Sequence, residues 1–410
     1  MSIKSNKTAW INGVLATMDP GITDNDYGLL RNKAIITEGG IITAIVPNND
    51  REVGTCKIRI DCKGALATPG FIDCHTHLVY AGNRACEWEL RLKGASYREI
   101  AESGGGIQTT VQATRAASFE DLYTLAEKRL AAMQSEGVTT VEIKSGYGLE
   151  KSAERKILEV IRSLKAKGTI DIAPAFLAAH SVPPEYIGRA DAYMNLICRE
   201  MIPEFWGDGL FEAADIFVES IAFNLEQAEK MYRTCAAFGI PVKAHNEQIS
   251  NIGGSALLAR YKGRSTDHIE RIDEAGVKAL AEAGTVGVLL PGAFYFLRDT
   301  RPPPVALLRR YKVPMAVATD YNPGTSPFTS IRQALNMAST FFGLTPAEAL
   351  AGVTRHAAKA LGREHTHGIL RPGFHANFAL WNVKDPVEIF YELGPNPLQF
   401  IVFEGDIHPS

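Results

Sequence analysis

TPGFIDCHTH, at residues 68–77, is the stretch that decides the fold of this chain. Its apolar run delivers His75 and His77, two residues apart, to a point where the chain is expected to leave a β-strand. Side chains at positions i and i+2 of a strand point to the same side, so both imidazoles can reach one metal ion. Because His-x-His also occurs by chance, the metal interpretation depends on the rest of the chain.

Strand and helix patterns alternate beyond this motif, over residues 67–368. Strand-like runs stand at 69–73, 139–144, 171–177, 216–219, 242–245, 265–269, 285–290 and 315–320, and amphipathic stretches at 122–135, 154–167, 225–238, 273–282 and 303–310. Repeated β-then-α units predict a parallel sheet covered by helices, and eight strands fit a (β/α)8 TIM barrel. An open doubly wound sheet is the alternative, but no G-x-G-x-x-G follows the first strand.

The two ends of the chain have a different pattern, of short alternating β segments. These segments stand at residues 9–14, 34–37, 41–46 and 57–61, and again at 378–381 and 400–404. Gly39 and Gly40 predict a hairpin turn between two of them. Each end is too small for its own core, so residues 1–66 and 369–410 are expected to form one composite β-sandwich.

Composition excludes several classes of protein. Charged residues make up 22% of the 410 residues and hydrophobic residues 46%, and the net charge is −3, with no basic cluster for nucleic acid. No run of about 18 apolar residues or signal-peptide core occurs, so no membrane partner is expected. Six cysteines without a C-x-x-C pair indicate reduced thiols and a cytoplasmic location.

Functional groups of a TIM barrel lie at the carboxyl ends of its strands, and this rule selects among the histidines. His180, His245 and His268 end or lie in predicted strands, and Asp320 ends the apolar run before it. Asn322, Thr325 or Ser326 would cap a helix beginning near Phe328, which leaves Asp320 free for another role.

Three imidazoles and a carboxylate, from His75, His77, His245 and Asp320, suit one divalent ion such as zinc or iron. Such an ion lowers the pKa of a bound water towards about 7. A second His-x-His, at His365 and His367, has no apolar strand before it and is assigned to the surface. Residues 104–106 (GGG) predict a loop, either a mobile lid or a plain turn.

These features together resemble the amidohydrolase superfamily, whose barrel is flanked by a small β-sandwich. Within it, the chain resembles the imidazolonepropionase family, on residues 81–84 (AGNR), 142–149 (EIKSGYGL), 285–293 (TVGVLLPGA) and 319–326 (TDYNPGTS). The resemblance covers nearly the whole chain. It implies hydrolysis of the ring C–N amide bond of 4-imidazolone-5-propanoate to N-formimidoyl-L-glutamate, in histidine degradation.

The resemblance also implies roles for particular residues. Arg84 would hold the propanoate, since guanidinium binds carboxylate in a bidentate way, although it could instead pair with Glu87 or Glu89. The other residues implied to contact the substrate or line its pocket are Tyr147, His180, Gln248, Asn322, Gly324 and Thr325. One Zn²⁺ or Fe²⁺/Fe³⁺ per subunit is expected, in a homodimer.

The sequence offers more than one candidate for the groups that transfer protons. Some relatives have a glutamate where this chain has Gln248, and glutamine cannot act as a base. Asp320 with His268 is favoured as the proton-transfer pair, with Glu247 as a substitute on a continuing strand, and His180 would polarise the substrate carbonyl. Lys144 is expected to be an ordinary amine, paired with Glu142 or Glu247.

Two rival functions are a ring deaminase of the same superfamily and a barrel that binds metal without catalysis. A neutral base needs no carboxylate clamp, so Arg84 argues against the deaminase. A structural zinc site would fill all four positions with Cys or His, away from a pocket. The crowding of polar groups at one barrel mouth therefore favours catalysis.

Overall fold

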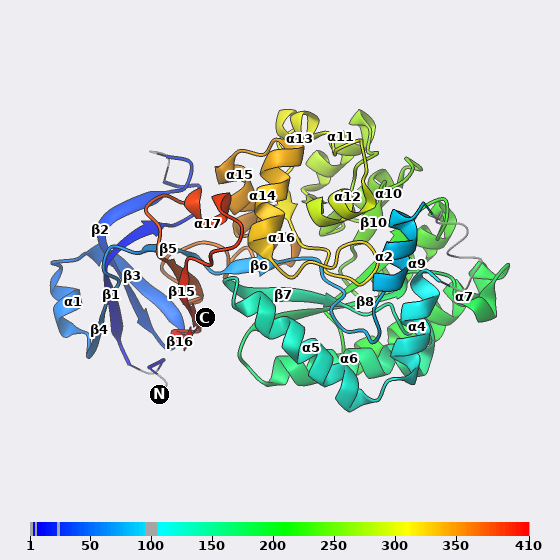
Figure 1. The fold of residues 1–410 in the computed structure, drawn as a ribbon, viewed down its shortest axis with the longest axis horizontal. Coiled ribbons are helices and arrows are strands. Elements are labelled where there is room, and N and C mark those ends of the chain that lie inside the picture. Colours follow the sequence, from blue (N-terminus) through cyan, green and yellow to red (C-terminus); the bar gives the residue numbers. More distant parts are fainter. Residues whose placement is uncertain (1–2, 5, 23–24, 95–104, 410) are drawn as a thin grey trace.

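The computed structural model describes residues 3–4, 6–22, 25–94 and 105–409, which form a parallel barrel and a separate sheet built from both chain ends (Figure 1). Both termini lie at the separate sheet, on the left of Figure 1. The predicted fold class is therefore confirmed.

Eight strands form the barrel sheet, and every neighbouring pair is parallel. They are β6 (Phe71–Asp73), β7 (Val138–Lys144), β8 (Asp171–Ala179), β9 (Ala213–Val218), β10 (Ala244–Asn246), β11 (Ser265–His268), β12 (Val286–Leu289) and β13 (Met315–Val317). A parallel bridge between Thr76 and Tyr321 joins the first strand end to the last, which closes the ring and excludes the open doubly wound sheet.

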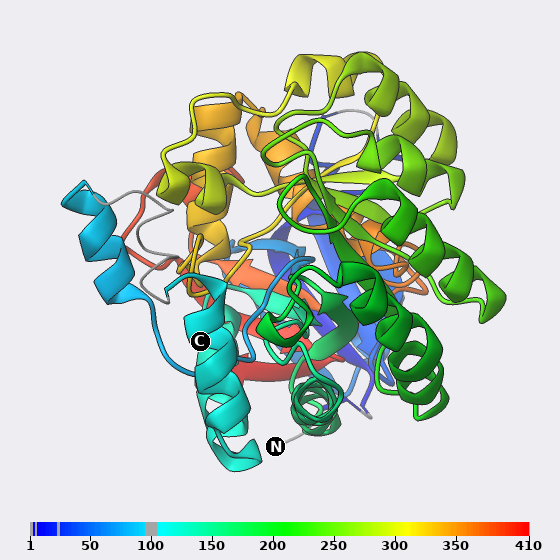
Figure 2. The same ribbon diagram turned by 90° about the vertical axis from the view of Figure 1, so that its right-hand side faces the viewer.

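The helices surround these strands (Figure 2). Those of the barrel are α2 (Ala85–Leu92), α4 (Ile107–Ala116), α5 (Phe119–Gln134), α6 (Lys151–Ala166), α7 (Ala190–Leu196), α8 (Ile202–Gly207), α9 (Leu225–Ala237), α10 (Gly254–Arg260), α11 (Glu274–Ala283), α12 (Pro291–Leu297), α13 (Val305–Arg310), α14 (Ile331–Phe342), α15 (Pro346–Gly352) and α16 (Arg355–Ala360). A 3-10 turn at Pro184–Tyr186 and a π-helical turn at Ile197–Met201 complete this set.

The helix ends follow sequence signals. Ser118 and Asn224 form capping boxes that begin α5 and α9, and Gly284 ends α11 in a left-handed conformation. Helix α14 begins at Ile331 with Ser330 as its cap, later than the start expected near Phe328. Asp320 is therefore not a helix cap.

The second sheet consists of β1 (Thr8–Ala16), β2 (Leu29–Glu38), β3 (Ile41–Pro47), β4 (Ile58–Asp61), β5 (Leu66–Pro69), β14 (Phe378–Trp381), β15 (Leu398–Phe403) and β16 (Asp406–Pro409). Short helices α1 (Arg51–Thr55) and α17 (Glu388–Tyr391) accompany it. The amino-terminal and carboxyl-terminal parts meet where β5 pairs with β14. In its core Trp10 packs edge-on against Phe378 at 5.0 Å. The predicted hairpin at Gly39 and Gly40 is confirmed between β2 and β3.

The passage from the second sheet into the barrel takes one residue, Gly70, between β5 and β6. A Cβ there would lie 2.1 Å from Thr139 Oγ1, so only glycine fits. Across the same junction Trp381 stacks on Phe71 at 5.0 Å. The division at residues 66/67 and 368/369 stays a prediction.

Three further expectations concern features outside the barrel sheet. Gly104 of the predicted loop lies outside the described residues, and Gly106 is the N-cap of α4. Within the described ranges, no helix is long and apolar enough to cross a membrane. All six cysteines are free thiols, and five are buried.

Candidate active site

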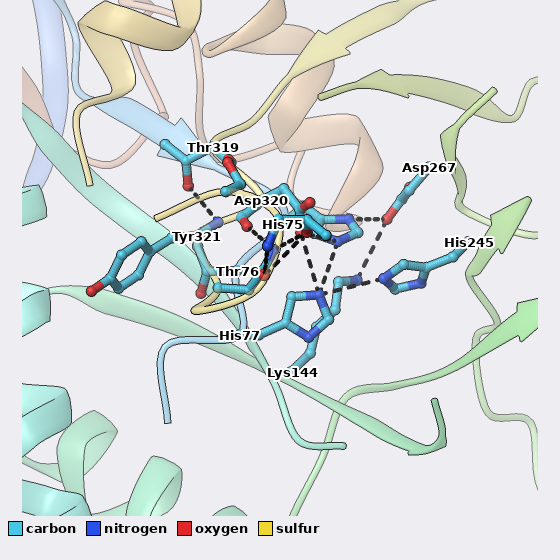
Figure 3. Close-up of polar contacts among 12 residues, drawn as sticks. His75, Thr76, His77, Lys144, His245, Asp267, Thr319, Asp320 and Tyr321 are labelled. Atoms are coloured by element: carbon cyan, nitrogen blue, oxygen red, sulfur yellow. Dashed lines mark hydrogen bonds and ion pairs between the residues drawn. The ribbon is translucent and has the colours of Figure 1, made fainter. Parts of the chain in front are cut away.

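Three histidine side chains and one carboxylate converge at the carboxyl ends of the barrel strands (Figure 3). His75 and His77 follow β6, His245 lies in β10, and Asp320 follows β13. The Nε2 atoms of the histidines are close: that of His77 lies 3.2 Å from that of His75 and 3.4 Å from that of His245. Asp320 Oδ1 lies 3.4 Å from His75 Nε2 and 3.5 Å from His77 Nε2.

These separations fit the ligands of one metal ion. Ligand atoms about 2.1 Å from a tetrahedral ion lie about 3.4 Å apart. Burial lowers the pKa of His75 and of His77 well below the usual value. Both rings are therefore neutral, and a neutral imidazole does not repel a cation. All four groups are buried. The donor set therefore fits a divalent metal.

Two buried carboxylates orient the outer nitrogens of this group. Asp267 Oδ2 lies 2.6 Å from His75 Nδ1, and Asp215 Oδ1 lies 3.2 Å from His245 Nδ1. Because a carboxylate accepts, each Nδ1 carries the proton and donates it. Each Nε2 then has a free lone pair aimed at the shared point, which is how proteins orient histidine ligands.

The side chain of Lys144 lies next to the metal-ligating histidines (Figure 3). Lys144 Nζ lies 2.6 Å from Asp215 Oδ2, 2.7 Å from Glu142 Oε2 and 3.5 Å from Asp267 Oδ2. Burial opposes its charge, but these three carboxylates outweigh it and hold the pKa of Lys144 well above its usual value. Lys144 is therefore the paired amine expected, with Glu142 as one partner.

The lysine also bears on the number of metal ions. His75, Glu142 and Asp267 form a second group with ligand atoms close enough for an ion, but its two carboxylates already face Lys144. An ammonium supplies the positive charge that a second cation would bring. The arrangement therefore supports a site for one metal.

A cavity of about 530 Å³ opens beside the metal ligands. It is lined by His77, Arg84, Tyr147, His180, His245, Gln248, His268, Asp320, Asn322 and Thr325, among others. The structure thus brings the sequence-derived candidates to one cavity, with His75 behind it and Gly324 beside Arg84.

Of the two pairings considered for Arg84 in the sequence, the structure shows the salt bridge with Glu87. Its Nε donates to Glu87 Oε2 at 2.8 Å, and its side chain is only 14% exposed. The guanidinium lies against Gly324, where an added Cβ would be 2.1 Å from Nη1. The salt bridge occupies Nε, so the terminal nitrogens remain for a ligand carboxylate in the cavity.

The loop after β13 is held by its own side chain. Asn322 Oδ1 accepts from the N–H groups of Gly324 and Thr325, both at 2.8 Å. Its Nδ2 donates to the Asp320 carbonyl at 2.7 Å. Asn322 therefore shapes the pocket wall by fixing this loop beside Asp320.

The proton-transfer candidates differ in orientation. His268 lines the cavity, its Nδ1 has no hydrogen-bond partner among the described residues, and burial lowers its pKa well below the usual value. Burial raises the pKa of Asp320 well above the usual value. Glu247 points elsewhere, because its φ of 50° ends the strand and its carboxylate accepts from Ser255 N at 3.1 Å.

The second His-x-His is separate from this site. The His365 side chain is 92% exposed, and His367 packs against His375 at 4.6 Å with Asp171 3.6 Å from Nε2. Neither belongs to a possible three-ligand group among the described residues.

Sequence reasoning missed the charged residues inside the barrel: Asp215, Lys243 and Asp267, together with Glu154 on α6. Lys243 Nζ lies 2.6 Å from Glu142 Oε1, so two lysines and three carboxylates form one buried cluster. In the sequence, the three barrel residues could have been noticed as charged side chains that face the barrel interior from otherwise apolar strands.

A model of the amidohydrolase family matches residues 66–407, so the chain belongs to this family of hydrolases. Solved structures with the same fold include a triazine hydrolase variant (TM-score 0.74, 16% identity, covering 98% of this chain and 94% of that one). Another is the 5-methylcytosine deaminase of Klebsiella pneumoniae (TM-score 0.74, 17% identity, covering 97% and 96%).

Sequence relatives narrow this assignment. The imidazolonepropionase of Salmonella schwarzengrund (strain CVM19633) is 57% identical over 400 residues, which cover 98% of both chains. That of Salmonella typhi is 56% identical over the same coverage. The chain is therefore a member of the imidazolonepropionase family.

Proposed function

We propose that this chain hydrolyses the ring C–N amide bond of 4-imidazolone-5-propanoate to N-formimidoyl-L-glutamate, a step of histidine degradation. The observation that carries the proposal is one cavity with metal-ligating groups at one wall and the Arg84 guanidinium at another. A substrate with a reactive cyclic amide and a carboxylate tail needs both. Relatives at 57% identity bear the name of this activity.

His75, His77, His245 and Asp320 would hold one Zn²⁺ or Fe²⁺/Fe³⁺ ion. When bound, the ion supplies Lewis-acid activation of water and neutralises charge that develops on the amide oxygen. Asp320 and His268 border the cavity and are proposed to accept a proton from the water and pass it to the leaving ring nitrogen. Gln248 has no ionisable group to act as a base, and it would orient the ring by hydrogen bonds.

For His180 we propose a different role from the carbonyl polarisation expected from the sequence. Its Nδ1 lies 3.1 Å from the Gly146 carbonyl, so the proton is on Nδ1 and Nε2 is an acceptor. Burial lowers the pKa of His180 to about 4, so the ring is neutral near pH 7. We propose that Nε2 accepts a hydrogen bond from a ring N–H of the substrate.

The propanoate is proposed to bind Arg84 beside Gly324 and Thr325, with Tyr147 across the ring. We also propose that the chain forms a homodimer. We propose a cytoplasmic location, because free thiols in all six cysteines support a reducing compartment. No nucleic acid is proposed as a partner.

Ultraviolet loss of imidazolone propanoate with metal-loaded protein tests the proposal. Arg84→Met should raise KM by about 10–100-fold, because a charge-assisted carboxylate contact is lost. Lys93→Met is the matched control. Lys93 is an exposed residue at the end of α2 that pairs with Glu89, and it does not line the cavity. No turnover of the imidazolone, with ammonia release from a purine or pyrimidine, would instead identify a ring deaminase.

A further inference from the structure

Glu154 is a fully buried carboxylate that the proposed reaction does not use. It stands in the first turn of α6, and its side chain points to the loop that follows β7. Its Oε1 accepts from Gly148 N at 2.7 Å and Leu149 N at 2.8 Å, and its Oε2 accepts from Gly146 N at 3.1 Å. Three backbone N–H groups of four consecutive residues thus converge on one side chain.

This loop carries one wall of the substrate cavity. Tyr147 lies between the bonded residues and is 3% exposed. The carbonyl of Gly146 fixes the His180 ring through Nδ1 at 3.1 Å. The loop therefore orients both aromatic side chains, which lie 5.4 Å apart between ring centroids.

The loop backbone is strained at one residue and packs closely on α6 at another. Gly146 has φ 112° and Leu149 has φ 51°, and the latter is a left-handed conformation that costs a non-glycine residue about 1 kcal/mol or more. Gly148 packs so closely on α6 that a Cβ would lie 2.5 Å from Glu154 N. Hydrogen bonds to a buried carboxylate offset such strain.

We propose that Glu154 is a positioning residue: it fixes the loop of residues 146–149 and, through that loop, the orientation of Tyr147 and His180 towards the substrate. The inference rests on the proposed function for the contacts of these two side chains with substrate. Glu154 is not among the residues that line the cavity, so it acts through the loop and not on the substrate. The metal ligands follow or lie in other strands, so we expect Glu154 to act on substrate contacts with the metal content unchanged.

Glu154→Gln tests this, because an amide group cannot accept from all three N–H donors. We expect kcat/KM to fall by about 10–100-fold with unchanged metal content, as for other outer residues that orient a site. Glu159→Gln is the matched control on the same helix, since Glu159 is a partly exposed residue whose partner is Arg155 at 3.6 Å. It should retain wild-type kinetics.

A double-mutant cycle separates positioning from general support of the fold. In a Tyr147→Ala/His180→Ala background, Glu154→Gln should lower kcat/KM by less than about 3-fold, because the groups that it positions are gone. The same loss in both backgrounds overturns the proposal. If Glu154→Gln does not fold, Gly148→Ala disturbs the same contact from the loop side and enters the same cycle.

Hydrogen–deuterium exchange supplies a readout without substrate. The amides of residues 146–149 should exchange faster in Glu154→Gln than in wild type, and unchanged exchange overturns the proposal. If the wild-type protein leaves the imidazolone intact, the proposed function fails, whereas the exchange result still decides whether Glu154 holds the loop.

Discussion

Replacing Lys144 by methionine tests the account of the buried charges behind the metal ligands. Lys144 has no exposed surface and contacts Glu142, Asp215 and Asp267. Methionine fills much of the volume but leaves three carboxylates with a single cation, Lys243. An uncompensated buried charge costs about 3–5 kcal/mol.

That cost can be expressed as a melting temperature. Unfolding entropy of about 2.1 cal/mol/K per residue gives a chain of 410 residues about 0.9 kcal/mol/K, so the cost corresponds to about 3–6 °C. Metal affinity should also fall by about 10–100-fold, because Asp267 and Asp215 orient the ligands His75 and His245.

Calorimetry of metal-free protein isolates the first effect, and metal titration measures the second. Lys167→Met is the control: Lys167 pairs with Glu127 at 2.6 Å but is half exposed, so it should cost at most about 1 kcal/mol. Adding Glu142→Gln to Lys144→Met removes one surplus carboxylate and should recover part of the loss. A Lys144→Met protein that melts within 1 °C of wild type would refute this reasoning about the cluster.

Three further outcomes are expected. Gly324→Ala should raise KM about 10-fold or more with unchanged metal content, because its Cβ would lie 2.1 Å from Arg84 Nη1; steady-state kinetics with metal analysis measures this, and an unchanged KM contradicts it. Burial lowers the pKa of His356 to about 4, so the folded state binds fewer protons than the unfolded state between about pH 4 and 6.5, and stability falls as the pH drops through this window. His356→Gln should remove at most about 3 kcal/mol of that dependence, seen in unfolding at pH 7 and pH 4.5; equal pH profiles would count against it. Chelation of the metal should lower the melting temperature by about 5 °C when the ion was present at about 1,000 times its Kd, and re-addition of zinc or iron should restore it.

The barrel was predictable because its strands are short apolar runs, and amphipathic stretches follow five of the eight. The run at residues 139–144 corresponds to β7 and that at 154–167 to α6, with boundaries that differ by a few residues. The rule that groups at strand ends share one mouth then brought His75, His245 and Asp320 together, although they lie far apart in sequence. These steps need only periodicity and the parallel topology.

The partners of the ligands were less accessible. Asp215, Lys243 and Asp267 each look like an isolated charge in a strand, and only the closed barrel shows that they meet. Glu154 reads as an ordinary helix residue, whereas its burial against the loop depends on how α6 packs on β8. Pairing across the barrel is a tertiary property that no local pattern contains.

Glu247 shows where periodicity misleads at the site itself. It stands two residues after His245, so a continuing strand would have turned both side chains to the cavity. The strand instead ends at Asn246, the φ of Glu247 is 50°, and its carboxylate turns to Ser255 at the start of α10.

Positive φ recurs at His268 (80°) and Asp320 (53°), also at strand ends. Such conformations are kept where a site requires them. With Glu247 turned away and Gln248 unable to act as a base, the structure leaves the proposal of Asp320 and His268 as the proton-transfer pair without these two competitors.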